Sequence, residues 1–314
     1  MLATAPAGLA TVLRVLPPTS ERLVMLATFI PYGLAFWLPA VALLGVAAMR
    51  AWRHRTTARS ALSMLSVLSA AGLAATVVWQ APAFVADSRS TTTKPLTVVS
   101  LNVAQRAEPQ AVSRAVSGAD VVVFVEAAHA WTLTLPPDFR KEFPYVAPAR
   151  RDIFGGAVIF SRYPIAASTE LLASTFQNWA AIVDTPQLGK LRVVGVHPCN
   201  PYCPAGLWAE EAERIRVWLD ERNQSIPTVV AGDFNAVDDH ITMRNLYDDG
   251  FRSAADLAGA GFVRTCPANR GIPPLIGIDH VLVDGRLTVT AFSTFSVPLT
   301  DHLGVRAVIA GTSG

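Results

Sequence analysis

The sequence predicts an α/β domain that follows a pair of membrane-spanning helices. Two features of the 314-residue chain lead to this prediction: long charge-free runs within residues 1–86, and an alternation of short Val- and Ile-rich runs with helical patterns in residues 96–314. With 51% hydrophobic residues, the chain can build one large domain and a further apolar segment. The expected domain of about 220 residues is large enough to bury a core of its own.

The two charge-free runs are each long enough to cross a bilayer. Residues 23–49 and 60–86 both extend for 27 residues without a charged side chain. A helix spans the hydrocarbon core with about 20 apolar residues, so either run can span it with some tilt. Buried core helices are the alternative, but two such runs in succession favour a membrane hairpin over residues 23–86. A cleaved signal peptide fits poorly, because the first run is too long and a second run follows it.

The loop between the runs orients the hairpin. Residues 50–59 hold four arginines and one histidine, and short basic loops remain in the cytoplasm. We therefore expect a multi-pass protein of the cell membrane whose domain of residues 96–314 is extracytoplasmic. Residues 1–22 are apolar but short and contain Arg14. We expect them to form an interfacial segment, with a third span as the alternative.

Charge separates the two parts of the chain. Residues 1–95 hold eight Lys and Arg against two Asp and Glu, whereas residues 96–314 hold 18 against 22. Residues 87–95, DSRSTTTKP, have the composition of a linker. Proteins that bind a nucleic-acid backbone usually carry a basic face, and the domain as a whole lacks the corresponding positive charge.

Polar residues stand where the strand-like runs of the domain end. In VVAGDFNAVDD, residues 229–239, a carboxylate and a carboxamide two positions apart follow a buried strand. We expect Gly232 to let the backbone come close to whatever these two side chains hold. A turn of the Asx type is the alternative explanation. Strands are expected at residues 97–103, 120–126, 156–161, 180–185, 191–197, 228–233, 278–283 and 305–310, and helices at 109–118 and 204–223. The polar positions are Asn102, Glu126, His197, Asp233, Asn235, Asp279, Asp301 and His302.

Taken in order, the motifs LNV, FVE, GVH, GDFN, IDH and TDH resemble the endonuclease/exonuclease/phosphatase superfamily. This superfamily includes pancreatic-type deoxyribonuclease, inositol polyphosphate 5-phosphatases and neutral sphingomyelinases. The resemblance covers residues 96–309 and rests mainly on GDFN together with the terminal DH. It implies a four-layer α/β sandwich with two central β-sheets packed face to face. It also implies a metal-dependent hydrolase that cleaves phosphoesters.

The resemblance implies a metal site at three of the polar positions. Glu126 resembles the metal ligand of the family, with Asn102 and Asp301 beside it. Mg²⁺ is a hard cation that binds one or two carboxylates and keeps several waters, and Mn²⁺ is the alternative ion. Ala104 stands where some nucleases of the family have a second acid, which weakens the interpretation as an abasic-site endonuclease.

The remaining polar positions carry the catalytic roles that the resemblance implies. His302 resembles the terminal histidine that acts on the water or the phosphate, and Asp279 orients it. Asp233 positions the nucleophile or protonates the leaving group, while Asn235 donates a hydrogen bond to a phosphate oxygen. His197 matches the histidine that many members place across the site as an acid or an oxyanion donor.

The other histidines and the cysteines lie outside this set. His54 is in the basic loop, His129 and His240 are expected to be solvated, and His280 is expected to face away from its neighbour Asp279. In an oxidising compartment we expect one disulfide, either between Cys199 and Cys203 or from one of them to Cys266, with one thiol left over. A zinc site built from His197, Cys199 and Cys203 is less favoured because the spacing is unusual.

Three functions are compatible with these features. The favoured one is a membrane-anchored phosphoesterase that acts on a lipid-linked phosphate or pyrophosphate, because membrane-anchored bacterial members linked to glycopeptide resistance are similar in layout. By that resemblance, undecaprenyl pyrophosphate is the natural candidate. An anchored extracytoplasmic nuclease or phosphodiesterase is the second, with nucleic acid as a less favoured partner than a lipid bilayer. A non-catalytic binding module is the third, and the sequence indicates no protein partner.

Overall fold

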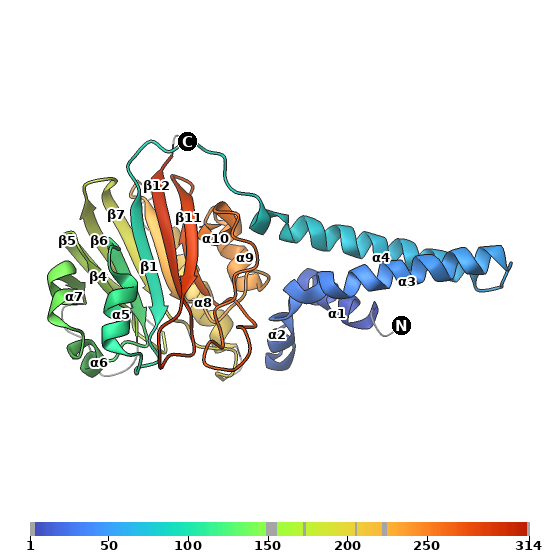
Figure 1. Ribbon diagram of the computed structural model, residues 1–314, viewed down its shortest axis with the longest axis horizontal. Helices are drawn as coiled ribbons and strands as arrows, with labels where there is room; N and C mark the ends of the chain where they lie inside the picture. Colours follow the sequence, from blue (N-terminus) through green and yellow to red (C-terminus); the bar gives the residue numbers. More distant parts are fainter. Residues whose placement is uncertain (1–3, 149–155, 172–173, 205, 222–224, 313–314) are drawn as a thin grey trace. The chain divides into compact units, whose positions relative to one another are not determined.

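The computed structural model describes residues 4–148, 156–171, 174–204, 206–221 and 225–312 (Figure 1). It divides into two compact units. The first contains the N-terminal helices up to Pro82 together with Asp239–Ile241, and the second contains Ala83–Asp238 and Thr242–Gly314.

The N-terminal unit contains two helices that are long and apolar enough to cross a membrane, over Ile30–Arg53 and Arg59–Phe84. Only 22% and 11% of their most apolar windows are buried, whereas the core helix of a soluble protein would be mostly buried. The first helix, α1, covers 12 described residues, whereas a span needs roughly 20, and a third span within residues 1–22 stays an untested alternative. The helices are α1 (Thr4–Val15), α2 (Glu21–Ala27), η1 (Ile30–Tyr32), α3 (Gly33–Arg53), α4 (Arg59–Gln80) and η2 (Ala81–Phe84).

Small residues and polar side chains join the helices of this unit. The indole of Trp37 on α3 packs against Gly72 on α4, where an added Cβ would lie 2.4 Å from the ring. The indole nitrogen of Trp37 donates to Thr11 Oγ1 on α1 at 3.1 Å. Gln80 Nε2 donates to the carbonyl of Pro31 at 2.9 Å. Close contacts at glycine and interhelical hydrogen bonds are the interactions by which helices associate in a bilayer, where the hydrophobic effect contributes little.

The second unit is built on two six-stranded sheets. The strand order is β11-β12-β1-β2-β4-β3 in the first sheet and β5-β6-β7-β8-β10-β9 in the second. The eight strands expected from the sequence are all present, and four more strands form the outer edges of the two sheets. The strands are β1 (Leu96–Asn102), β2 (Val121–Val125), β3 (Tyr145–Ala147), β4 (Val158–Ser161), β5 (Ile165–Leu171), β6 (Asn178–Thr185), β7 (Gly189–Val196), β8 (Thr228–Asp233), β9 (Arg252–Ser253), β10 (Asp279–Val283), β11 (Leu287–Phe295) and β12 (Gly304–Gly311).

Alternating side chains build the core between the sheets. Val98 on β1 and Val123 on β2 face Val193 on β7 and Val229 on β8, and all four are fully buried. The intervening residues of β1 and β2, such as Phe124, point to the other face and pack under helices. Because side chains alternate along a strand, a strand that is apolar at every position must be covered on both faces.

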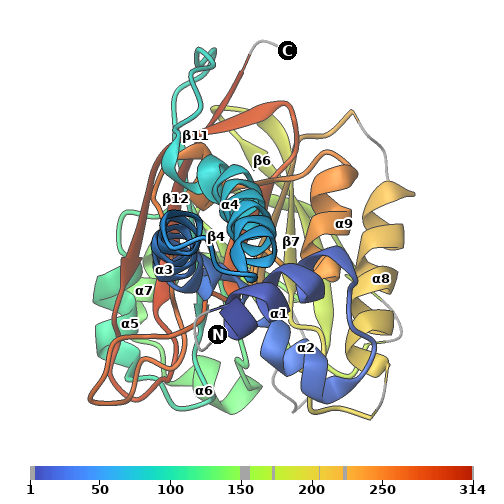
Figure 2. The ribbon, with the colours of Figure 1, turned by 90° about the vertical axis from the view of Figure 1, so that its right-hand side faces the viewer.

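Helices cover the outer face of each sheet and complete four layers (Figure 2). The helices α5, α6 and α7 lie against the first sheet, and α8 and α9 lie beside the second. This is the expected four-layer sandwich. The helices are α5 (Pro109–Val116), α6 (His129–Leu133), α7 (Pro137–Glu142), α8 (Leu207–Asp220), α9 (Ile241–Asp248) and α10 (Ala254–Leu257).

The segment before β1, which has a linker's composition, is bonded to the domain. The carboxylate of Asp87 accepts hydrogen bonds from Thr288 Oγ1 and from Arg89 Nε, both at 2.7 Å. Arg89 also donates to two backbone carbonyls near the start of β11. The compact unit therefore begins at Ala83. Composition did not reveal these contacts, because polar side chains and backbone groups make them.

Candidate active site

The polar positions meet at one end of the sandwich because of how the strands pair. β1 runs parallel to β2 in one sheet, and β7 runs parallel to β8 in the other, so the residues that end these strands lie at a common edge. The strand β10 is antiparallel to β8 in a register that pairs Asp279 with Asp233. The start of β10 therefore joins the same edge as the end of β8.

Asn102 connects the two sheets at this edge. Its side-chain nitrogen donates to Oε1 of Glu126 at 3.0 Å and to Oδ2 of Asp233 at 3.1 Å. Asn102 is fully buried and Asp233 is 2% exposed. The backbone carbonyl of Asn102 accepts from Thr300 Oγ1 at 2.7 Å, which attaches the loop before His302. One amide thus fixes two carboxylates that come from different sheets.

Two residues of the site have backbone conformations that are unusual for non-glycine residues. Glu126 has φ 51° and Asn235 has φ 49°, in the left-handed region where such residues cluster at functional sites. In Asn235 this conformation brings its N–H within 2.8 Å of Asp233 Oδ1. The Asx-type turn considered as an alternative to a site is therefore present, and it belongs to the site. The turn leaves Asp233 Oδ2 directed toward Asn102.

Gly232 has a different role from the one expected. Its φ is 156°, and an added Cβ would lie 2.0 Å from the carbonyl oxygen of Val196. The close approach that this glycine permits is therefore to the end of the neighbouring strand β7. The prediction that this glycine lets the backbone approach a bound group was wrong, because the space beside its Cα is filled by Val196. The glycine brings the ends of β7 and β8 together.

His302 and Asp279 form a buried pair. Nδ1 of His302 lies 2.8 Å from Asp279 Oδ2, and Nε2 lies 3.8 Å from Asp233 Oδ2. Burial alone lowers the pKa of His302, but the charge and hydrogen bond of Asp279, followed by contacts with Cys266 and Asp233, outweigh it and raise the pKa. The raised pKa favours the protonated ring, which Asp279 orients through Nδ1 so that Nε2 lies on the side of Asp233.

Asp233 lies between two histidines. Burial, reinforced by the charge of Asp279, raises the pKa of Asp233, and the nearby rings of His302 and His197 oppose this increase. Nε2 of His197 lies 3.9 Å from Asp233 Oδ2 and 3.8 Å from Glu126 Oε1. A carboxylate with a raised pKa is a stronger base than an exposed aspartate.

His197 is held by residues that the sequence analysis did not select. Its backbone N–H donates to Asn178 Oδ1 at 2.5 Å. Its ring is stacked on Phe176 with 4.4 Å between ring centroids and 15° between planes. Asn178 begins β6 and Phe176 precedes it, so neither ends a strand that the family motifs mark. The only signal in the sequence was an asparagine two positions before the strand expected at residues 180–185.

Two groups of side chains could hold a divalent cation. Ligand atoms of Asp233, Asp279 and His302 lie within 4.8 Å of one another, and because a protonated His302 has no lone pair to offer, the two carboxylates are the candidate ligands of this group. Oδ1 of Asp279 is buried without a hydrogen-bond partner in the described part of the chain, so its lone pairs remain for a cation or a water. The second group consists of Glu126 and Asp233, which both accept a hydrogen bond from the side-chain nitrogen of Asn102. The side chain of Glu126 is 33% exposed. Carboxylate oxygens suit Mg²⁺ and Mn²⁺, and the residues therefore fit such an ion.

Asn102 and Asp301, the other two expected metal ligands, do not direct a free side-chain oxygen to this cluster through any hydrogen bond or ion pair of the described residues. Asn102 directs its amide nitrogen to the carboxylates, while its Oδ1 accepts from the N–H of Ala104 at 2.9 Å. The backbone carbonyl of Asp301 accepts from the N–H of Ala268 at 2.7 Å. Within the described residues, the hydrogen bonds and ion pairs do not connect the Asp301 carboxylate to Glu126 or Asn102.

The cysteines and remaining histidines are also placed. Cys199 and Cys203 form a disulfide and Cys266 is a free thiol, which is one of the expected pairings and leaves neither bridged sulfur for a zinc ion. His240 is 4% exposed, so the expectation that it is solvated was wrong. Nε2 of His280 lies 2.8 Å from the carbonyl of Ala236.

A two-sheet sandwich with carboxylates and histidines gathered at one edge is the arrangement of a hydrolase, and its cluster of acidic residues could hold a metal. The model of the Endonuclease/Exonuclease/phosphatase family matches residues 99–302, which include every polar position described above. The chain therefore belongs to the Endonuclease/Exonuclease/phosphatase family. No match to the chain was found among curated proteins.

Solved structures share the fold of the domain. An endonuclease/exonuclease/phosphatase from Bacteroides vulgatus is 18% identical, with a TM-score of 0.55 over 69% of this chain and 99% of that one. A functionally unknown conserved protein from Enterococcus faecalis V583 is 17% identical, with a TM-score of 0.56 over 69% and 100%. TDP2 from D. rerio, complexed with a single-strand DNA product, is 15% identical, with a TM-score of 0.53 over 68% and 98%. At these identities the likeness extends to the fold alone.

The cluster around Asn102 yields a prediction about metal binding. Asn102→Asp replaces the shared donor with a third carboxylate between Glu126 and Asp233. In EDTA we expect the free energy of unfolding to fall by about 1–3 kcal/mol, because the buried Asp233 and the partly exposed Glu126 lose their shared donor and gain a like charge beside them. Mg²⁺ or Mn²⁺ should restore part of this loss by binding only the folded state. Thermal unfolding of the full chain in detergent measures both effects.

The control for this prediction is Asn245→Asp on α9, outside the site. It should show no stabilisation by metal beyond that of the wild type. If metal addition left the midpoint of Asn102→Asp unchanged, or shifted the control equally, the metal would not bind at this cluster.

Proposed function

We propose that this protein is a membrane-anchored, divalent-metal-dependent phosphoesterase that hydrolyses a lipid-linked phosphate or pyrophosphate outside the cytoplasmic membrane. The observation that carries the proposal is the position of Asp233, with the cationic His302 on one side and His197 on the other. In this arrangement Asp233 is the base, His302 is the positively charged hydrogen-bond donor, and His197 is the acid, and all three lie at the same edge of the sandwich. Hydrolysis of a phosphoester needs all three.

In this proposal Asp233 accepts the proton of the attacking water. Its raised pKa and the orientation of Oδ2 suit it to that role. His302, held as a cation by Asp279, donates from Nε2 to a phosphate oxygen and stabilises the charge that develops there. A cation that is held by a carboxylate is a poor base. We therefore assign the proton transfer to Asp233 and the electrostatic role to His302.

His197 and Asn235 act on the other side of the phosphate. Nε2 of His197 faces both Glu126 and Asp233, from where it protonates the leaving oxygen or donates to a phosphate oxygen. One N–H of the Asn235 side chain donates to the carbonyl of Pro198 at 3.0 Å, which fixes the amide plane. The second N–H then remains to donate to a phosphate oxygen.

Enzymes of this family depend on divalent metals. Glu126, with Asp233 and Asp279 close by, would hold Mg²⁺, or Mn²⁺ as the alternative. The ion, when bound, neutralises charge on the phosphate and lowers the pKa of water. In this proposal Asn102 and Asp301 remain beside the metal site. Asn102 contributes through the hydrogen bonds that orient Glu126 and Asp233.

The choice of a lipid substrate rests on the apolar helices of the N-terminal unit and on the negative net charge of residues 96–314. Two helices are able to span a membrane, and residues 96–314 carry more acidic than basic side chains. A nuclease is the second candidate. It is favoured by one observation, the fold likeness to D. rerio TDP2, which was complexed with a single-strand DNA product. A binding module without activity is disfavoured, because each expected acid, histidine and amide is present and most of them meet in one cluster.

The catalytic roles are tested by single substitutions. Glu126→Ala, Asp233→Ala and His302→Ala should each lower kcat for a small chromogenic phosphodiester by about 10²–10⁴-fold, while circular dichroism of the variants still shows the folded state. Asp138→Ala, whose side chain is 90% exposed on α7, is the control and should retain full activity. Activity of Glu126→Ala equal to that of the wild type would refute the metal assignment.

Membrane orientation is tested with reporter fusions. The basic loop at residues 50–59 predicts that a reporter active only outside the cytoplasm works at the C-terminus and fails within the loop. A cytoplasmic reporter should give the opposite result at the same two positions. The reverse pattern would place the domain in the cytoplasm, where a disulfide such as Cys199–Cys203 is rarely maintained.

Substrate class is tested by comparing the full chain with a form that begins at Ala83, where the compact domain starts. Both forms should hydrolyse the small phosphodiester equally. The shorter form should lose most of its turnover of a polyprenyl pyrophosphate in dilute micelles, because the anchor supplies effective concentration. Plasmid DNA, assayed over a salt series, distinguishes the second candidate. Strong, salt-sensitive DNA cleavage by the shorter form, without release of phosphate from the lipid, would favour a nuclease.

A further inference from the structure

The loop that follows β7 carries one catalytic residue and holds another. His197 is its first residue. The carbonyl of the next residue, Pro198, accepts from Asn235 Nδ2 at 3.0 Å. The indole of Trp208 donates to the carbonyl of Asn235 at 3.1 Å. The position of this loop therefore determines where both His197 and Asn235 direct their side chains.

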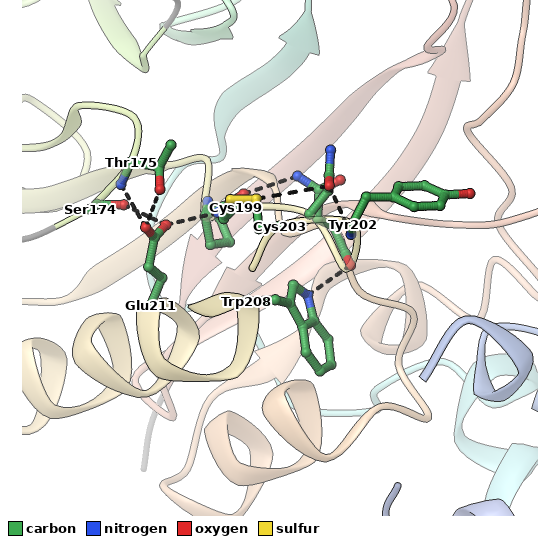
Figure 3. Close-up of a disulfide and its surroundings, with 10 residues drawn as sticks. Ser174, Thr175, Cys199, Tyr202, Cys203, Trp208 and Glu211 are labelled. Atoms are coloured by element: carbon green, nitrogen blue, oxygen red, sulfur yellow. Dashed lines mark hydrogen bonds between the residues drawn. A yellow bond between two sulfur atoms is a disulfide. The ribbon is translucent and has the colours of Figure 1, made fainter. Parts of the chain in front are cut away.

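A buried carboxylate on α8 holds the loop from outside the site. Glu211 is 2% exposed, and its Oε2 accepts from the backbone N–H of Cys199 at 2.8 Å. The same oxygen accepts from Ser174 Oγ at 3.0 Å. Its Oε1 accepts from the backbone N–H and the hydroxyl of Thr175, at 2.6 and 2.5 Å. Figure 3 shows Glu211 below these groups, with the disulfide of Cys199 beside it.

The second segment held by Glu211 forms the other wall around His197. Ser174 Oγ accepts from Asn178 Nδ2 at 2.7 Å, and Asn178 Oδ1 accepts from the N–H of His197. The ring of Phe176, between these residues, is stacked on the imidazole of His197. Glu211 thus connects the loop that carries His197 to the segment on which its ring rests.

The chemistry of this contact explains why a carboxylate is needed. A buried charged group is costly unless its lone pairs are filled by donors, and Glu211 accepts four hydrogen bonds. Each of its two oxygens accepts from a backbone N–H. The disulfide between Cys199 and Cys203 closes the loop just beyond the first of them. An amide cannot replace the carboxylate, because its nitrogen would face one of the two N–H groups.

We propose that Glu211 is a positioning residue for the reaction: it holds the 197–203 loop and the 174–178 segment together, and so fixes the imidazole of His197 and the amide of Asn235. The proposal rests on the proposed function in assigning catalytic roles to these two residues. Glu211 lies behind the loop and acts only through it.

The test is Glu211→Gln, with Glu210→Gln as the matched control. Glu210 is the adjacent residue on α8, where it pairs with Arg214 and has a side chain that is 61% exposed. With the full chain in detergent and a small chromogenic phosphodiester, Glu211→Gln should lower kcat by about 10–100-fold, because small displacements of catalytic groups have effects of this size. The control should match the wild type.

A double-mutant cycle separates positioning from general destabilisation. If Glu211 acts through His197, Glu211→Gln should lower kcat much less in a His197→Ala background than in the wild type. An equal fold-loss in both backgrounds, or no loss in the wild type, overturns the proposal.

A second measurement does not depend on activity. In full chain labelled with ¹³C-histidine, the His197 ring signal, assigned from its absence in His197→Ala, should be shifted by the stacked ring of Phe176. Glu211→Gln should reduce this shift or split the signal, while Glu210→Gln should leave it unchanged. An unchanged His197 signal in Glu211→Gln overturns the positioning role. Absence of phosphoesterase activity in the wild type would instead refute the proposed function, and the spectra would still decide the role of Glu211.

Discussion

The amide of Asn102 is the contact on which the rest of the site depends. Its nitrogen donates to Glu126 from the same sheet and to Asp233 from the facing sheet. These two carboxylates repel each other, and the buried one, Asp233, is also costly to desolvate unless a donor binds it. A neutral amide provides both hydrogen bonds without adding charge, and therefore connects the ends of β2 and β8 at the edge of the candidate site.

Local strain and polar contacts are concentrated at this same edge. Glu126 and Asn235 adopt left-handed backbone conformations, each of which costs about 1–3 kcal/mol when the surroundings do not compensate it. The compensation comes from the hydrogen bonds of the Asx turn and of Asn102, and from a core in which both faces of the central strands are packed. The rigid sheets thus hold residues in conformations that a flexible loop would not maintain.

The two units of the chain serve different physical purposes. The helices of the N-terminal unit are long, apolar and joined at small residues such as Gly72, which suits a lipid environment. The second unit begins at Ala83, and the polar contacts of Asp87 and Arg89 attach its first residues to the domain. Little chain separates the second helix from the domain.

The sequence by itself determined the central strands and the identity of most site residues, because a strand buried on both faces is a continuous apolar run and the polar residue that ends it is conspicuous. It did not reveal the strands β3, β5, β9 and β11, which are the sheet edges; β5, for example, is largely exposed. Only the tertiary structure decided that Asn102 faces the carboxylates with its nitrogen, that Gly232 serves the contact between β7 and β8, and that Glu211 lies behind His197. These relations join residues far apart in the chain, and no local pattern encodes a distance between two sheets.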